Sequence, residues 1–527
     1  MMTDKPFQVP VGQRQLFLDD HGIAETQRLL RTMHAPEKKG AVIEPQDDER
    51  YIQIRGAPAW DAQAGCYKLW IMCEGGIGLA QSTDGVNWER PVLRAREHRG
   101  SLENGLVAGP CGMQVVFDPT DPDPSRRYKA LHLRGSYERM VSPIAQHWKL
   151  LHNPWRLAYP QGHVLDNPRQ YQLSWVIRVS ERPDAPEDER FEGMGRYQTR
   201  DLVVSADGIH WRRLDCPGLP CGDEGNFSLD EQTGTFIATL KEGEMGPYGR
   251  SISLTTSMDF EHWTQPELVF HADERDQELN REVIAARLEN RSLNQPIFNV
   301  PEEYFVDVYN MGVFRYEGLY VGLPAFFHHT GDVDENSDGF HRVQLTSSRD
   351  LHNWTRLGER EAFIGPSTIE SGAYDRNGIM PPSNAIVKND ELWFYYNGSR
   401  YRQEPPDPES KSGGACLAVL RRDGFISLDA GPDGGALLTE SFVPQSPWLF
   451  TNVDAAGGSV QVEVLDESGS AIAESEPIKG DHGRYPVQWR TGDLAALVSR
   501  PVRLRFNVKD ASIYSYWFGT VTENPPH

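Results

Sequence analysis

The sequence predicts an all-β protein, built as a five-bladed β-propeller followed by a small antiparallel β-sandwich. Three observations predict this fold. A seven-residue motif recurs four times, short alternating strands bounded by Gly and Asp turns surround each copy, and the pattern of strands changes after about residue 444.

The composition and net charge of the chain argue against some classes of binding partner. The 527 residues include 53 Lys and Arg against 76 Asp and Glu, which gives a formal net charge of −23. Such a charge repels nucleic-acid phosphates and anionic lipid, so we expect no nucleic-acid partner and no membrane partner. With 48 Gly, 37 Pro and 10% aromatic residues, the chain suits a turn-rich β protein whose aromatic side chains line a sugar-type cleft.

The sequence offers no targeting or redox signal. No stretch approaches the ~18 consecutive apolar residues that a membrane span needs, and the first residues, MMTDKPFQVP, do not read as a secretory signal. The six cysteines show no zinc-binding spacing. We therefore expect a reduced cytoplasmic protein, with export by another route left open.

The repeated motif is S-x-D-x-x-x-W. It occurs as STDGVNW (82–88), SADGIHW (205–211), SMDFEHW (257–263) and SRDLHNW (348–354). The Asp is suited to accept backbone hydrogen bonds that close a turn, and Gly or a compact residue fits the tight bend. The Trp is expected to insert between neighbouring sheets. We therefore interpret the motif as a blade hairpin and not as a set of catalytic aspartates.

The spacing of the copies counts the blades. The interval of 52 residues from Ser205 to Ser257 is one blade of four short strands, and the longer intervals carry insertions near residues 135–198 and 270–300. The second insertion has Leu279, Val283 and Ala286 at helical spacing. A degenerate fifth copy, LRRDGFISL, ends near residue 428. Five blades over residues 1–437 is the favoured count, and six is the alternative.

The last part of the chain, residues 438–527, reads as the β-sandwich. The segments SVQVEVLD, YPVQWRT, VRLRFNV and IYSYWFGT alternate in hydropathy and are separated by Gly and Asp turns.

A five-bladed propeller followed by a β-sandwich resembles the architecture of glycoside hydrolase family 32, and the propeller alone resembles families 43, 62 and 68. The segments RQLFLDDHGIAE (14–25) and DASIYSYWFG, with the hairpin motif, also resemble a group of uncharacterised bacterial family-32-like proteins. The family-32 signatures WMNDPNG, Arg-Asp-Pro and Glu-Cys are absent in matching context, so no nucleophile is transferred from that family.

In a propeller, pocket residues lie just before the innermost strand of each blade. Four of the five segments in that position carry acidic residues, and hydrolysis of a glycosidic bond uses two carboxyl groups. The candidate catalytic residues are Asp223, Glu224, Asp307, Asp375 and Glu370. Because neighbouring side chains on a strand face opposite ways, we expect one of Asp223 and Glu224 to face the channel, and Asp307 and Tyr309 to share a face.

Polar and aromatic residues of the same segments are the candidate substrate-binding residues: Arg55, Asn104, Asn226, Tyr309, His328, His329 and Asn384. Asp19 and Asp20, in LFLDD, are expected to serve a closing or edge strand, since no inner strand follows them directly.

No cofactor is expected. The loop DVDENSDGF (332–340) matches the first half of a calcium loop through Asp334, Asn336 and Asp338, but Leu345 occupies the twelfth position where a bidentate acid is required. A solvated loop is the favoured interpretation, and a structural cation such as calcium is the alternative.

The function that these residues favour is a glycoside hydrolase that cleaves an oligo- or polysaccharide by a carboxylate acid/base mechanism at the channel mouth. The alternatives are a polysaccharide lyase or a glycoside phosphorylase on the same scaffold, and a non-catalytic carbohydrate-binding propeller. A lyase would use Tyr309, His329 and Arg55 against a uronate, and a phosphorylase would need a basic cluster. Fold alone does not choose among these functions.

Overall fold

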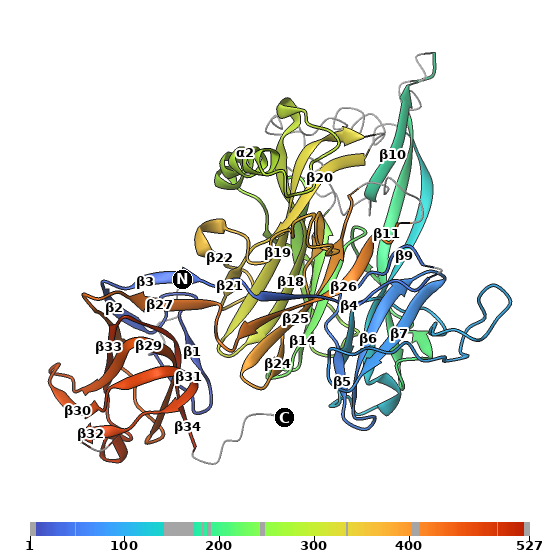
Figure 1. Cartoon of the computed structure of the whole chain (residues 1–527). Coiled ribbons are helices and arrows are strands. Elements are labelled where there is room, and N and C mark those ends of the chain that lie inside the picture. The colour runs from blue at the N-terminus through green and yellow to red at the C-terminus, as the bar shows by residue number, and fades with distance from the viewer. Residues whose placement is uncertain are drawn as a thin grey trace.

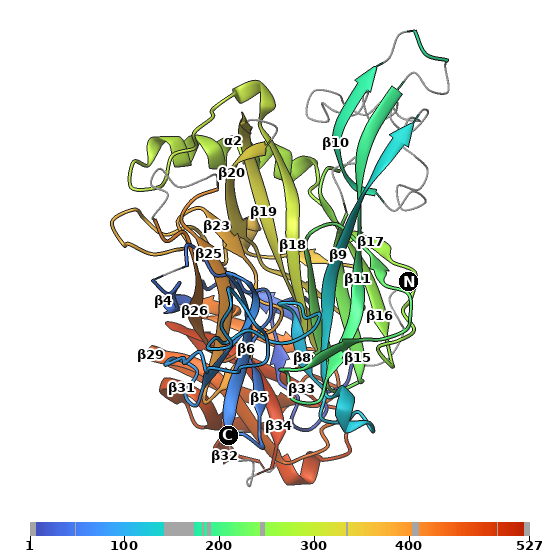
Figure 2. The ribbon, with the colours of Figure 1, turned by 90° about the vertical axis from the view of Figure 1, so that its right-hand side faces the viewer.

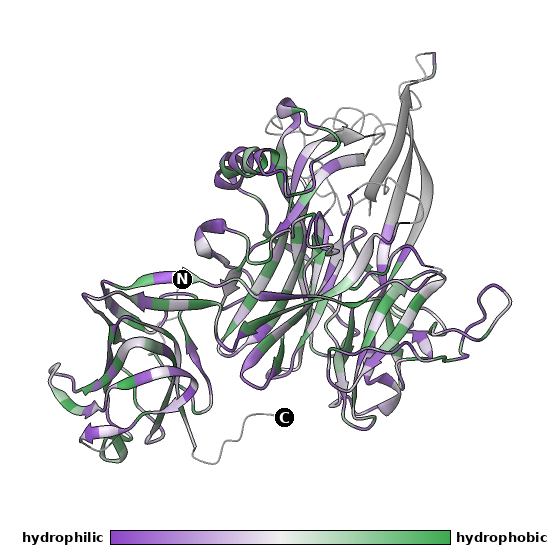
Figure 3. Cartoon of the chain, in the orientation of Figure 1, coloured by the Kyte–Doolittle hydropathy of each residue, from purple (hydrophilic) through white to green (hydrophobic). Residues whose placement is uncertain are grey.

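The structure is a computed structural model that describes residues 7–47, 49–141, 173–181, 184–186, 191–242, 248–333, 336–402, 410–492 and 494–520. It confirms the five-bladed propeller, with a second β unit beside it (Figure 1). Apolar residues gather along the strands, while the turns between them are hydrophilic (Figure 3). The described helices are α2 (Glu274–Glu289) and the short 3-10 turns η1 (Pro124–Arg126), η4 (Pro301–Glu303), η5 (Gly358–Arg360) and η6 (Leu494–Leu497).

The first two blades are antiparallel sheets of unequal size. Blade 1 contains β5 (Ala59–Asp61), β6 (Cys66–Cys73) and β7 (Gly76–Ser82). Blade 2 runs β8 (Val115–Phe117), β9 (Tyr128–Val141), β11 (Phe191–Ser205) and β12 (Trp211–Arg213), with β10 (Leu173–Glu181) and β13 (Leu219–Pro220) also paired to β11. Strands β9, β10 and β11 extend beyond the blade as an arm (Figure 2). The rest of the expected insertion, residues 142–172, lies outside the described residues.

Blades 3 and 4 form the centre of the chain. Blade 3 is β14 (Gly225–Asp230), β15 (Thr235–Glu242), β16 (Ser251–Ser257) and β17 (Glu267–Phe270). Blade 4 is β18 (Phe305–Tyr316), β19 (Leu319–Val333), β21 (Thr346–Ser348) and β22 (Thr355–Arg356), with β20 (Asn336–Val343) also paired to β19. Helix α2 lies between the two blades in sequence, as the spacing of the second insertion predicts.

Blade 5 closes the ring with a strand from the other end of the chain. It contains β23 (Gly378–Met380), β24 (Ile386–Lys388), β25 (Glu391–Ser399) and β26 (Gly413–Arg421), and the outer strand β4 (Glu37–Ile43) pairs antiparallel with β26. At the axis, a Cβ on Gly312 of β18 would lie 1.9 Å from the carbonyl oxygen of Pro382, so only glycine allows blades 4 and 5 to approach this closely.

The second β unit is one curled antiparallel sheet of eleven strands. Its later strands are β27 (Ile426–Ala430), β28 (Gly435–Thr439), β29 (Trp448–Leu465), β30 (Ala471–Ser475), β31 (Ile478–Pro486), β32 (Trp489–Thr491), β33 (Arg503–Lys509) and β34 (Ala511–Gly519). The N-terminal strands β1 (Gln15–Leu16), β2 (Ile23–Gln27) and β3 (Leu30–Met33) pair into it. The division of the chain at residues 437 and 438 stays a prediction.

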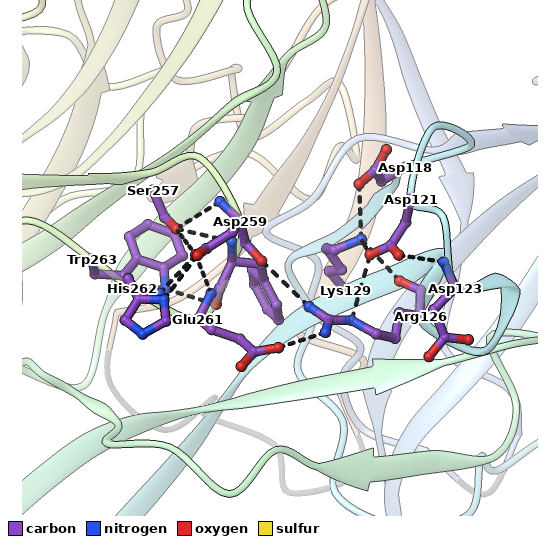
Figure 4. Close-up of polar contacts among 11 residues, drawn as sticks. Asp118, Asp121, Asp123, Arg126, Lys129, Ser257, Asp259, Glu261, His262 and Trp263 are labelled. Carbon is purple, nitrogen blue, oxygen red and sulfur yellow. Dashed lines mark hydrogen bonds and ion pairs between the residues drawn. The ribbon is translucent and has the colours of Figure 1, made fainter.

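The repeated motif has the predicted local structure in all four copies. In blade 3, Asp259 accepts hydrogen bonds from the backbone N–H groups of Glu261 (2.9 Å) and His262 (2.8 Å), and the indole of Trp263 donates to the carbonyl of Phe260 (Figure 4). The residue before Trp, always Asn or His, has its side chain on the second carboxylate oxygen of the Asp. This contact explains a pattern that is visible in the sequence.

Two expectations about the motif need correction. The tight bend has a positive φ, and the expectation of Gly or a compact residue there fails at Phe260 (φ 68°) and Leu351 (φ 68°). Both side chains are buried, so their packing offsets the strain. The fifth copy is not a motif of this kind, because Asp423 accepts from the side chains of Arg14, Tyr316 and Ser515 at the exit of blade 5.

Neighbouring blades are joined through these hairpins. Trp211 packs edge-on against Trp70 of blade 1, with ring centroids 6.2 Å apart, and the indole of Trp70 donates to the carbonyl of Gly208. Between blades 2 and 3, Arg126 contacts Glu261 and the backbone of Asp259, beside the Lys129 ion pairs with Asp118 and Asp121 (Figure 4). The predicted insertion of Trp between sheets is therefore confirmed for Trp211.

Candidate active site

Glu224, just before the innermost strand of blade 3, is contacted by side chains from blades 1 and 4. The Arg55 guanidinium of blade 1 donates to both carboxylate oxygens of Glu224, from Nε at 2.8 Å and from Nη2 at 2.6 Å. Arg55 is buried and is also held by the carbonyl of Ile54 and the side chain of Gln53. Paired N–H donors of this kind fix both the position and the orientation of a carboxylate.

Blade 4 reaches the same carboxylate through a β-bulge. The register of β18 on β19 shifts between Val308 and Asn310, which leaves Tyr309 as the extra residue. Asn310 then donates from Nδ2 to Glu224 at 2.9 Å and accepts from Asn226 at 3.3 Å. A bulge re-aims side chains in this way, so three blades converge on one carboxylate.

Asp223 makes a separate ion pair with Lys241 of β15. The cations Lys241, Arg250 and Arg200 hold the pKa of the Asp223 carboxyl well below its usual range, against the opposing effect of burial. The Lys241 ammonium also lies 4.2 Å from the ring centroid of Tyr309. The backbone N–H of Lys241 also donates to the carbonyl oxygen of Glu224 at 3.1 Å, which links the two acidic residues through Lys241. The expectation that one of Asp223 and Glu224 faces the channel stays a prediction.

The carboxylate of Asp307, on strand β18 of blade 4, is fully buried. Its carboxylate accepts from the Arg250 backbone N–H and guanidinium, both at 3.1 Å, and lies 3.2 Å from Nε2 of His329. Burial opposes ionisation, but Arg250 and His329 lower the pKa of Asp307 overall. The Arg250 guanidinium also lies 5.4 Å from the ring centroid of Tyr309, so it contacts Asp307 and lies beside Tyr309. Because the β-bulge interrupts strand alternation at Tyr309, the expected shared face of Asp307 and Tyr309 stays a prediction.

The cluster holds more cations than carboxylates. Among the residues that the structure describes, the cations are Arg55, Arg200, Lys241, Arg250 and Arg402, and the carboxylates are Asp223, Glu224, Asp307 and Glu242, whose charge acts on Cys221 together with those of Arg200 and Asp223. The Arg402 guanidinium lies 5.7 Å from the centroid of Tyr309 and 4.8 Å from that of Phe327. In a chain of formal net charge −23, this local excess of positive charge suits a ligand with an anionic group.

The remaining predicted site residues lie elsewhere in the described contacts. Asp375 is buried in blade 5, where it bonds Lys38 (2.7 Å) and Tyr396 (2.7 Å). His328 faces Asn280 of α2 at 2.7 Å, on the side of β19 opposite to His329. Asn104 closes a turn with Ser101 and Arg96. Glu370 is exposed in a loop and Asn384 is half-buried, and among the described contacts neither residue touches the cluster.

Sequence reasoning identified Arg55 but missed the other cations of the cluster. Lys241 sits at the end of the otherwise apolar strand TFIATLKE, and that unusual position was its one sequence signal. Arg250 directly precedes β16 and Arg402 follows β25, both outside regular strands, where a basic residue is ordinarily solvated. Their roles depend on contacts between blades, which spacing along the chain does not report.

The described residues include no group of three or more His, Cys, Asp or Glu arranged to hold a metal ion. Asp338 of the calcium-like loop is committed instead to the backbone N–H groups of Ile297 (2.6 Å) and Phe298 (2.8 Å). Asp334 lies outside the described residues, as does the side chain of Asn336. All six cysteines are free, and none of the described helices has the length and apolar character of a membrane span.

No protein-family model matches this sequence, and no curated protein sequence matches it. Some solved structures are distantly similar to this chain. One described as a glycoside hydrolase is 13% identical over 73% of this chain and 92% of its own, with a TM-score of 0.35. An N-acetylgalactosamine deacetylase from F. plautii, in complex with blood group B trisaccharide, is 10% identical over 75% and 96%, with a TM-score of 0.36.

A third similar structure comes from a family of mannoside phosphorylases that contains glycoside hydrolases acting on β-1,2-mannosidic linkages in Candida mannan. It is 12% identical over 74% of this chain and 94% of its own, with a TM-score of 0.33. At these identities and TM-scores, the similarities assign no activity to the chain.

Proposed function

We propose that this chain hydrolyses a glycosidic bond of an oligo- or polysaccharide at the cluster around Glu224. One observation carries the proposal: Asp223 and Glu224 are neighbouring, partly exposed carboxylates whose partners come from three blades. Glu224 contacts Arg55 of blade 1 and Asn310 of blade 4, and Asp223 contacts Lys241 of blade 3. Glycoside hydrolysis needs two carboxyl groups beside the scissile bond, one to protonate the leaving oxygen and one to act as base or nucleophile.

The environments of the two carboxyl groups suggest their roles. Lys241 keeps Asp223 ionised, which suits a base or a nucleophile. We assign Glu224 the role of proton donor. Arg55 engages both of its oxygens in the free protein, so this role requires the substrate to displace the Arg55 pair and leave Glu224 facing the leaving oxygen.

Asp307 is assigned a positioning role. Its carboxylate is fully buried and enclosed by Arg250 and His329, so it has no path to a substrate atom. Its effect on the reaction passes through Arg250, which it holds beside Tyr309.

A second candidate function is favoured by the cations around Tyr309. Lys241, Arg250 and Arg402 surround this phenol at 4.2, 5.4 and 5.7 Å from its centroid. Elimination at a uronate needs cations that neutralise the sugar carboxylate and a group such as Tyr that moves the proton. The same cations would serve phosphate in a phosphorolytic reaction.

One assay separates these reactions. Purified protein is incubated with 4-nitrophenyl glycosides and with neutral and uronate-containing polysaccharides, with and without inorganic phosphate. Hydrolysis predicts new reducing ends that need no phosphate and bring no rise in ultraviolet absorbance. A rise from an unsaturated uronate would replace hydrolysis by elimination, and a sugar phosphate formed only with phosphate would replace it by phosphorolysis.

A further inference from the structure

A cavity lies between helix α2 and blade 4, and its lining includes no residue of the Glu224 cluster. Its volume is about 590 Å³, within the range of sites that hold small molecules. Its walls come from α2, from strands β18, β19 and β20, and from the segment 359–368. Figure 1 shows α2 beside the β20 end of blade 4.

Helix α2 presents an unusual arrangement to this cavity. Its most buried positions include the polar residues Asp276, Asn280 and Arg287. The apolar positions at helical spacing, Leu279, Val283 and Ala286, line the cavity and are not packed into the core. An amphipathic helix normally buries its apolar positions, so the apolar wall of the cavity is left for another molecule to cover.

Arg287 is a buried guanidinium without a charge partner. Its Nε donates to the backbone carbonyl of Asn294 at 2.8 Å. Its Nη2 donates to the backbone carbonyl of Arg376 at 3.2 Å and to the side-chain oxygen Oδ1 of Asn377 at 3.0 Å. Its Nη1 has no partner, and no ion pair of Arg287 occurs in the described part of the chain. Burial lowers the pKa of Arg287 to about 10. A buried charge is costly unless it is paired.

The neighbouring histidine supplies the complementary group. Nδ1 of His328 lies 2.7 Å from Oδ1 of Asn280 and donates to it, so Nε2 carries a lone pair, and that atom has no partner either. Burial lowers the pKa of His328 well below its usual value, which keeps the ring neutral. Both residues pack on Phe340, with Arg287 4.1 Å and the His328 ring 5.0 Å from its centroid.

The other cations of the cavity are already compensated. Arg342 pairs with Glu361 at 2.8 Å, and Arg360 pairs with Asp273 and Asp276. Asp338 is the carboxylate whose charge acts on Arg287. Its Oδ2 already accepts hydrogen bonds from the backbone N–H groups of Ile297 and Phe298. Among the described residues of the cavity wall, Arg287 is therefore the cation without an ion-pair partner. The wall also carries the exposed carboxylates Glu282 and Glu359.

We infer that this cavity binds a small hydroxylated carboxylate, of the chemical class of a sugar acid. The ligand carboxylate accepts from Nη1 of Arg287, a ligand hydroxyl donates to Nε2 of His328, and the carbon skeleton covers the stripe of Leu279, Val283 and Ala286. Inorganic phosphate fits less well, because it has no carbon skeleton to cover the apolar positions of α2 that line the cavity. This site is separate from the proposed reaction at Glu224 and does not depend on it.

The test is isothermal titration calorimetry of the whole chain with D-glucuronate, D-glucose and inorganic phosphate as probes. Arg287→Gln removes the charge, and Ala286→Trp fills the cavity from its exposed helical wall without touching Arg287. Arg291→Met, an exposed arginine just after α2, is the matched control.

We expect D-glucuronate to bind the wild type at one site and D-glucose to bind it much more weakly. Arg287→Gln should weaken glucuronate binding about 30-fold or more, Ala286→Trp should abolish it, and Arg291→Met should leave it unchanged. If Arg287→Gln does not fold, the loss or retention of glucuronate binding in Ala286→Trp still tests whether the ligand occupies this cavity. Glucuronate binding that survives Ala286→Trp, equal binding of glucose or of phosphate, or no binding of glucuronate would each overturn the inference.

Discussion

At the scale of the residue, the candidate site shows what a sequence can and cannot reveal. Asp223 and Glu224 are identifiable because acidic residues directly precede an inner strand. Their partners Arg55 and Lys241 come from a different blade and a neighbouring strand, at sequence separations of 169 and 18 residues. Only the folded ring brings these charges into contact, so the ionisation state of Asp223 follows from the structure and not from the spacing of residues.

The dependence of Asp223 on Lys241 predicts a shift in pH dependence. Lys241→Met removes the main attraction that lowers the pKa of Asp223. The pKa of Asp223 should rise, and the acid limb of kcat/KM should move to higher pH because Asp223 must be ionised to act. Profiles of kcat/KM against pH measure this shift, with Lys39→Met, an exposed lysine, as the matched control. An unmoved acid limb in Lys241→Met would separate Asp223 from the reaction.

At the scale of the element, the hairpin motif was the most predictable feature. Its Ser, Asp and Trp contacts are local, and local chemistry is what a sequence pattern records. No sequence pattern indicates the β-bulge at Tyr309, because the extra residue in β18 is defined only by the pairing of β18 with β19. The same limit applies at Phe260 and Leu351, which take a positive φ without glycine because the core packing around them decides their conformation.

The two forms of the motif predict a difference in pH-dependent stability. His262 bonds Asp259 through Nδ1 at 2.8 Å, and this contact raises the pKa of His262 above 6.5. Since the folded-state pKa is the higher one, the stabilisation is present below pH 6.5 and is lost as pH rises through the folded-state value. Asn occupies this position in two copies and bonds the Asp without titrating.

His262→Asn should therefore remove one pH-dependent contribution to stability and leave the hairpin intact. Urea unfolding of wild type and His262→Asn between about pH 5 and 9 measures it. The wild type should lose stability relative to the variant as pH rises. Parallel stability curves for the two proteins would show that the His262 contact does not affect folding.

At the scale of the whole molecule, the two ends of the chain cooperate. Strand β4 completes blade 5, while β1, β2 and β3 pair into the C-terminal sheet. Leu16, Phe17 and Leu18 of the LFLDD segment are buried in the core that the two units share. The sequence predicted both units, but it did not predict that N-terminal strands join them, since a strand pattern does not name its partner.

A buried ion pair at this junction predicts a large loss of stability. Arg14 contacts Asp423 at 2.5 Å, and both are buried. Arg14→Met leaves the Asp423 carboxylate without its cation and should cost about 3 kcal/mol in the free energy of unfolding, measured by urea denaturation. Adding Asp423→Asn should recover part of that loss. A change below about 1 kcal/mol in Arg14→Met would mean that the hydrogen bonds from Tyr316, Ser515 and Asn452 satisfy Asp423 without the cation.

The proposed reaction depends on Asp223 and Glu224 as the reacting pair, and a comparison of variants at these positions tests it. On a substrate that the wild type cleaves, kcat/KM is measured for Asp223→Asn, Glu224→Gln and Glu370→Gln, with folding checked by circular dichroism. We predict losses of about 100-fold or more in the first two variants and near wild-type activity in Glu370→Gln, whose carboxyl is exposed in a loop. Retained activity in both Asp223→Asn and Glu224→Gln would contradict the account.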